Sequence, residues 1–106
     1  MVLAKTSSGH VEEDRTVNKL RLKFYKYEYA MDIAEFAYLL KSTRRMYLDC
    51  RGFNQAWYKK FMFRFRKYKT PYWFSKSEVI ELWDLLTDTK SVIEMDYILK
   101  DRLKIK

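Results

Sequence analysis

The segment Leu20-Arg-Leu-Lys-Phe-Tyr-Lys-Tyr27 alternates apolar and polar residues, and the segment Phe61-Met-Phe-Arg-Phe-Arg-Lys-Tyr68 repeats that alternation. A period of two is typical of a strand that buries one face and exposes the other. Each segment is therefore predicted to be a strand. The residues expected to face the core are Leu20, Leu22 and Phe24 in the first strand and Phe61, Phe63 and Phe65 in the second.

A helical pattern follows each predicted strand. Apolar residues at positions i, i+3, i+4 and i+7 indicate an amphipathic helix with one buried face. Asp32 with Glu35, and Ser75 with Glu78, have the spacing of a capping box, which marks the start of a helix. The two apolar stripes are Ile33, Phe36, Ala37 and Leu40, and then Val79, Leu82, Trp83 and Leu86.

A short alternating run follows each helix, at Met46–Cys50 and at Ile93–Tyr97, and Arg51-Gly52-Phe53-Asn54 has the composition of a turn between the two halves. The predicted order is strand, helix, strand, strand, helix, strand. This order resembles the ferredoxin-like architecture, an α+β fold in which a four-stranded antiparallel sheet carries both helices on one face. That resemblance implies that strands 20–27 and 61–68 lie side by side at the centre. Residues 91–104 also fit a helical period, so a third helix there remains an alternative.

The first 17 residues differ from the rest of the chain. They contain no aromatic residue and include the acidic cluster Glu12, Glu13 and Asp14. We predict a flexible N-terminal arm over 1–17 and a single α+β domain over 18–106, because the arm has little apolar surface to offset the entropy of ordering.

Net charge limits the kind of partner. The chain carries 22 basic and 14 acidic side chains, a net charge of +8, and residues 18–69 alone carry +10 from 14 basic and 4 acidic groups. One Cys and one His cannot form an internal disulfide or the usual zinc site, so no metal and no cofactor is expected. No apolar run approaches the ~20 residues of a membrane helix. We expect a soluble, intracellular protein without a membrane partner.

The outward face of the predicted sheet is the candidate site. Basic side chains neutralise phosphates, and tyrosine rings stack on unpaired bases. The layout resembles the RNA-recognition motif, and Lys59-Lys-Phe-Met-Phe63 is similar to the basic and aromatic part of that family's third-strand signature, without its glycines. The residues predicted to bind nucleic acid are Arg21, Lys23, Tyr25, Tyr27, Lys59, Lys60, Arg64, Arg66 and Tyr68.

These observations favour a non-enzymatic protein that binds RNA or single-stranded DNA. The alternative is a protein-interaction module or inhibitor that uses the same face for a homodimer or an acidic partner. The composition is biased as expected of an AT-rich genome, with 42 residues of Phe, Tyr, Met, Ile, Asn and Lys against 16 of Gly, Ala, Arg and Pro. A viral or mobile-element origin, with action in the host cell, is a further hypothesis.

Tyr72 and Trp73 either cover the end of the sheet or contact a ligand, whereas Phe74 is expected to pack against Val79.

Overall fold

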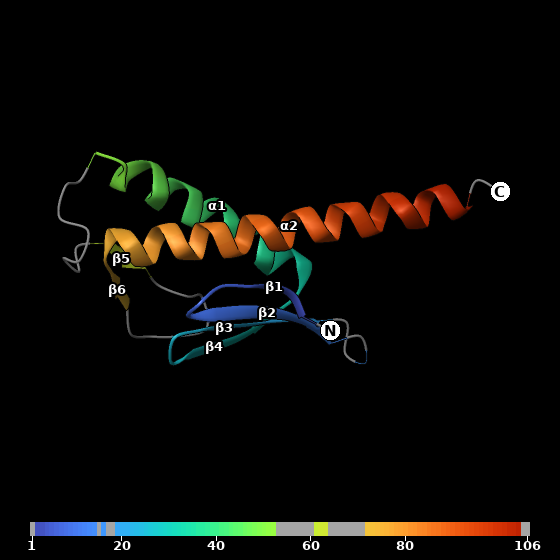
Figure 1. The fold of residues 1–106 in the computed structure, drawn as a ribbon, viewed down its shortest axis with the longest axis horizontal. Coiled ribbons are helices and arrows are strands. Elements are labelled where there is room, and N and C mark those ends of the chain that lie inside the picture. Colours follow the sequence, from blue (N-terminus) through green and yellow to red (C-terminus); the bar gives the residue numbers. More distant parts are fainter. Residues whose placement is uncertain (1, 15, 17–18, 53–60, 64–71, 105–106) are drawn as a thin grey trace.

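The computed structural model describes residues 2–14, 16, 19–52, 61–63 and 72–104 (Figure 1). A four-stranded antiparallel sheet comes first in the chain, and the first helix, a short hairpin and a long second helix follow it. The elements are β1 (Val2–Lys5), β2 (Gly9–Asp14), β3 (Lys19–Phe24), β4 (Tyr27–Met31), α1 (Ile33–Cys50), β5 (Phe61–Phe63), β6 (Tyr72–Phe74) and α2 (Lys76–Lys104).

The sheet is a meander in the order β1-β2-β3-β4, and both helices lie on the same side of it (Figure 1). α2 packs on β1 and β2, and α1 packs on β3 and β4. The alternation predicted for the first strand is confirmed, because Leu20, Leu22 and Phe24 are buried and the residues between them are exposed. The fold is therefore α+β, with the predicted antiparallel sheet of four strands and two helices.

The N-terminal segment corrects the expectation of a flexible arm. Residues 2–5 and 9–14 form β1 and β2, and β2 pairs with β3 along its whole length. Val11 is fully buried opposite Leu22. The segment lacks aromatic residues, but backbone pairing with β3 and the burial of Val11 are sufficient to order it.

The strand predicted at 46–50 is wrong, because α1 continues to Cys50. Its start is as predicted, since the Asp32 carboxylate accepts from the Glu35 amide and the Glu35 carboxylate accepts from the Asp32 amide. The buried face differs from the predicted stripe, because Ile33 is 57% exposed. Phe36, Leu39, Thr43, Met46 and Cys50 form the buried face, at alternating spacings of three and four residues.

The strand predicted at 93–97 is also wrong, because these residues belong to α2. The alternative of a helix over 91–104 is confirmed, as a continuation of α2 rather than a third helix. The predicted capping box is present, with the Ser75 amide donating to Glu78 at 2.9 Å and the Glu78 amide donating to the Ser75 hydroxyl at 3.2 Å. The C-terminal part of α2 extends past the edge of the sheet (Figure 1).

Strand order departs from the ferredoxin-like prediction. β3 lies between β2 and β4, whereas β5 pairs with β6 in a separate two-stranded sheet, with Phe61 opposite Phe74. The strand around residue 61 is therefore not the neighbour of β3. The similarity in layout to the RNA-recognition motif does not extend to the observed pairing.

Close packing of β2 on β3 predicts that Gly9→Ala destabilises the fold. A Cβ atom at Gly9 would overlap the carbonyl oxygen of Lys23 and lie 3.0 Å from the Cα of Phe24. We expect a loss of about 1–3 kcal/mol in the free energy of unfolding, the usual cost of overpacking. Urea denaturation of the purified variant measures this loss.

Gly52→Ala is the matched control, because a Cβ at Gly52 meets nothing within 4 Å and the backbone there has no positive φ. Its stability should be equal to that of the unmodified chain or slightly higher. Equal stability of both variants would contradict the observed register of β2 and β3.

Candidate functional site

The outer face of the sheet carries the predicted basic residues of β3. Arg21 and Lys23 are exposed there together with Lys19. Each of them has an acidic residue as a cross-strand neighbour. The pairs are Lys19 with Asp14 and Arg21 with Glu12 on β2, and Lys23 with Glu28 on β4.

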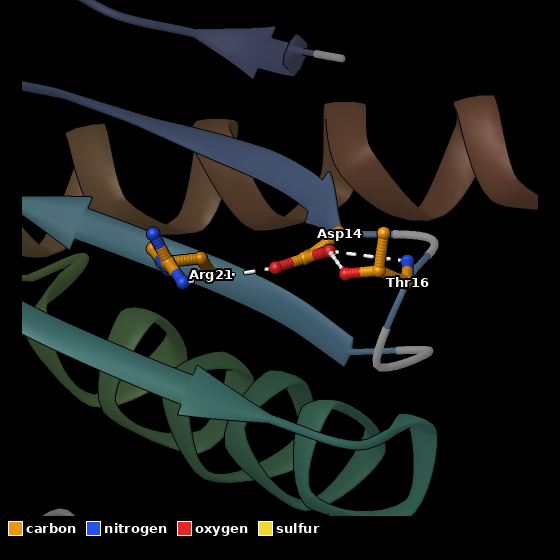
Figure 2. Close-up of polar contacts among 3 residues, drawn as sticks. All are labelled: Asp14, Thr16 and Arg21. Atoms are coloured by element: carbon orange, nitrogen blue, oxygen red, sulfur yellow. Dashed lines mark hydrogen bonds and ion pairs between the residues drawn. The ribbon is translucent and has the colours of Figure 1, made fainter.

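The Asp14 carboxylate contacts both Arg21 on β3 and Thr16 in the turn that follows β2. Its carboxylate lies 3.8 Å from the Arg21 guanidinium and accepts hydrogen bonds from the Thr16 amide at 3.1 Å and hydroxyl at 2.6 Å (Figure 2). On the same strand, Glu12 lies 3.1 Å from the His10 imidazole. The acidic cluster that was assigned to a flexible arm therefore lies among the basic side chains of β3. Opposite charges at this spacing offset the positive potential of the face.

The remaining four basic residues and the last tyrosine of the predicted site cannot be placed on this face. Lys59, Lys60, Arg64, Arg66 and Tyr68 lie outside the described residues. Met62, on β5 between them in the sequence, is 54% exposed.

Tyr25 and Tyr27 lie at the end of the sheet. Tyr25 and Lys26 form the two-residue connection between β3 and β4, and Phe24 pairs with Tyr27 across it. The backbone φ of Tyr25 is +55°, which is the left-handed region. A positive φ at the first central position of a hairpin turn normally selects glycine. A side chain there costs about 1–3 kcal/mol, which the surrounding structure must offset.

Neighbouring turns hold Tyr25 in this conformation. The Tyr25 amide donates a 2.8 Å hydrogen bond to the carbonyl oxygen of Ser8, in the turn between β1 and β2. The hydroxyls of Ser7 and Ser8 both donate to the same carboxylate oxygen of Glu81 on α2, at 3.0 and 3.2 Å. The β1–β2 turn thus connects the long helix to the backbone of Tyr25.

An open hollow of about 680 Å³ lies beside this turn, within the range of about 300–1,000 Å³ that is usual for ligand pockets. Two of its aromatic residues face solvent, since Tyr25 is 44% and Trp73 54% exposed. The hollow is lined by Tyr25, Lys26, Tyr27, Trp73, Phe74 and Glu78.

Phe74 forms the rigid base of the hollow. It is 1% exposed, and its ring makes edge contacts with Phe24 at a centroid distance of 5.9 Å and with Tyr27 at 6.4 Å. Because the capping box starts α2 directly after Phe74, the helix also sets the position of Trp73. Phe74 and Val79, which are predicted to pack together, are both buried in the same core cluster.

Two charged residues border the aromatic rings. The Lys26 ammonium lies 5.7 Å from the centroid of the Tyr27 ring, a cation–π distance. The Glu78 carboxylate accepts from the Ser75 amide in the capping box. The hollow therefore combines π faces with one cation and one carboxylate, and the Lys26 ammonium beside the rings suits a planar group attached to an anion.

Sequence reasoning found part of this site. It selected Tyr25 and Tyr27, though for the sheet face, and it left Trp73 open between covering the sheet and contacting a ligand. Lys26 and Glu78 were missed, because their position depends on the approach of β6 to the β3–β4 turn. The run Pro71-Tyr72-Trp73-Phe74 was the available signal for a second aromatic wall.

Other reactive groups are placed elsewhere. Cys50 is fully buried in the core, and its thiol donates to the Tyr47 carbonyl oxygen at 3.2 Å. Burial raises the pKa of that thiol, although the Lys76 ammonium partly opposes the shift.

In the part of the chain that the structure describes, no three His, Cys, Asp or Glu side chains lie close enough together to bind a metal ion. Neither helix combines the length and the apolar character needed to cross a bilayer, over those same residues.

Neighbouring residues of β6 should respond differently to truncation. Phe74→Ala empties a buried ring position and should lower the free energy of unfolding by about 3–5 kcal/mol. Trp73→Ala removes an exposed ring and should change it by roughly 0.5 kcal/mol. Thermal melts of both variants measure this; an early melt of the Trp73 variant would show that Trp73 supports the fold instead of lining an open site.

Comparison with known proteins assigns no family or function to this chain. No protein-family model, no curated protein and no solved structure matches the chain. The function is therefore argued from the residues of the aromatic hollow and from the charge of the chain.

Proposed function

We propose that this chain is a small, basic, non-enzymatic nucleic-acid-binding protein that takes RNA or single-stranded DNA at the aromatic hollow. The observation that carries the proposal is the hollow itself, in which the exposed rings of Tyr25 and Trp73 stand beside the Lys26 ammonium. Bases stack on such rings whatever their sequence, and a neighbouring cation neutralises the phosphate.

Charge supports a polyanionic partner. The chain carries +8 overall and +10 over residues 18–69. A basic surface raises the local concentration of nucleic acid and releases counterions when phosphates bind.

The hollow is a better candidate than the outer face of the sheet. On that face Arg21 has Asp14 at 3.8 Å and Glu12 directly across the strand pair. A phosphate approaching Arg21 would meet these carboxylates as well. The hollow also holds one carboxylate, Glu78, beside the Lys26 ammonium, so its advantage over the sheet face is the exposed rings of Tyr25 and Trp73 and not a larger positive charge.

A non-enzymatic role agrees with where the reactive side chains lie. His10, the one histidine of the chain, pairs with Glu12 on the sheet face, and Cys50, the one cysteine, is buried at the C-terminal end of α1. Neither residue lines the hollow.

Salt dependence tests the proposal. Fluorescence anisotropy with labelled single-stranded and duplex probes should show an affinity that falls with salt, by roughly 0.7 log units per log unit of salt for each phosphate contacted by a single strand. Lys26→Ala should lower the slope of log affinity against log salt by the amount for one phosphate contact, roughly 0.7. The double variant Arg21→Ala/Lys23→Ala is the control, and should leave the slope nearly unchanged because acidic neighbours already offset these charges.

Three results would contradict parts of the proposal. Absence of binding to every probe at low salt would exclude a nucleic-acid partner. A slope lowered only by the double variant would move the interface to the sheet face. Polyglutamate binding in place of nucleic acid, or self-association in sedimentation, would favour the protein-interaction alternative.

A further inference from the structure

We infer that Tyr25 is a preformed stacking platform that makes the hollow selective for unpaired bases over duplex; this inference rests on the proposed nucleic-acid function. Three features of Tyr25 carry it: an unfavourable backbone conformation, a ring that the core does not require, and a backbone held in place by two other elements.

The first feature is the conformation. At φ = +55° the turn favours glycine, which has no Cβ to clash with the backbone. A glycine would close the β3–β4 hairpin with less strain. Such strain concentrates at functional sites, where the surrounding structure maintains it. The geometry of the turn therefore gives no reason for a tyrosine at position 25.

The second feature is the position of the ring. Tyr25 is 44% exposed, and its ring touches that of Phe24 edge-on, with a centroid distance of 4.7 Å and an interplanar angle of 82°. Phe24 itself is fully buried and also packs against Phe74. The core is thus closed beneath Tyr25, and the ring of Tyr25 adds a wall to the hollow.

The third feature is restraint of the backbone. The Tyr25 amide donates a hydrogen bond to the Ser8 carbonyl oxygen. The hydroxyls of Ser7 and Ser8 donate hydrogen bonds to the Glu81 carboxylate on α2. Gly9 packs directly against the backbone of Lys23 and Phe24, just before Tyr25. A residue that is already ordered loses little conformational entropy when a ligand binds, so restraint strengthens binding.

These features favour one kind of occupant. The rings of Tyr25, Tyr27 and Trp73 line the hollow, and the Lys26 ammonium is next to them. A base can lie against an aromatic face only when it is unpaired and turned out of its own helix. A duplex presents its phosphates to Lys26 but keeps its bases stacked internally. The hollow should therefore distinguish single strands from duplex through its rings.

Tyr25→Gly separates this role from a structural one. Glycine relieves the left-handed turn, so the thermal midpoint should stay the same or rise. Affinity for a short labelled oligothymidylate strand should fall about tenfold, within the roughly 5- to 150-fold range expected when one stacking ring is lost. Affinity for a blunt-ended duplex, which has no unpaired loop, should stay unchanged. Tyr25→Phe keeps the ring and should retain single-strand binding.

Two further variants complete the experiment. Tyr38→Ala removes a tyrosine of similar exposure, 48%, from α1 outside the hollow, and should leave both affinities unchanged. Trp73→Ala removes the other exposed aromatic residue of the hollow without changing any turn, and should also lower single-strand affinity. It tests the stacking site even if Tyr25→Gly unfolds.

The outcomes distinguish this inference from the proposed function. Binding of single strand and duplex by the unmodified chain, with no loss in Tyr25→Gly or Trp73→Ala, would overturn the stacking platform and leave nucleic-acid binding intact. Absence of binding to both probes would overturn both. Loss of single-strand affinity that follows only a lower thermal midpoint, and recovers on cooling, would make Tyr25 a structural residue.

Discussion

Antiparallel pairing of β2 with β3 is the interaction on which the rest of the structure depends. It places Val11 against Leu22 on the core side and makes β3 an inner strand of the sheet. Gly9, at the other end of the pair, lies so close to the backbone of Lys23 that no larger residue fits without a shift. The register is thus specified twice, by a buried apolar pair and by a steric limit. A slip of one residue would expose Val11 and bury the charges beside it.

The same pairing decides the electrostatic character of the sheet. Because cross-strand neighbours share a face, Glu12 and Asp14 come to the side of Arg21 and Lys19. A strand that looks strongly basic by itself becomes part of a mixed surface, which suits solvation better than the capture of a polyanion. The excess positive charge of the chain lies outside these pairs, and Lys26 at the β3–β4 turn carries part of it.

Local and distant interactions meet at the aromatic hollow. The capping box of Ser75 and Glu78 begins α2 and leaves Phe74 buried and Trp73 exposed directly before it. The turn between β1 and β2 binds Glu81 through its serine hydroxyls and Tyr25 through its Ser8 carbonyl. The two exposed aromatic residues of the hollow, Tyr25 and Trp73, are therefore both linked to the first turns of α2. An aromatic site anchored in this way is ordered before any ligand arrives.

Structural features that depend on residues close together in the chain can be predicted directly from the sequence. The alternation of Leu20, Leu22 and Phe24 predicts the buried face of β3, and both capping boxes predict where the helices begin, because these signals depend on atoms a few residues apart. Helix ends were misread, because Met46 and Cys50 fit a strand and a helix equally well until the rest of the buried face is known. Strand partners, the neutralised sheet face and the hollow depend on contacts between residues distant in sequence. Only the folded chain brings Asp14 to Arg21 and Trp73 to the hollow beside Tyr25, because which strand pairs with β3 is settled by packing the whole core at once.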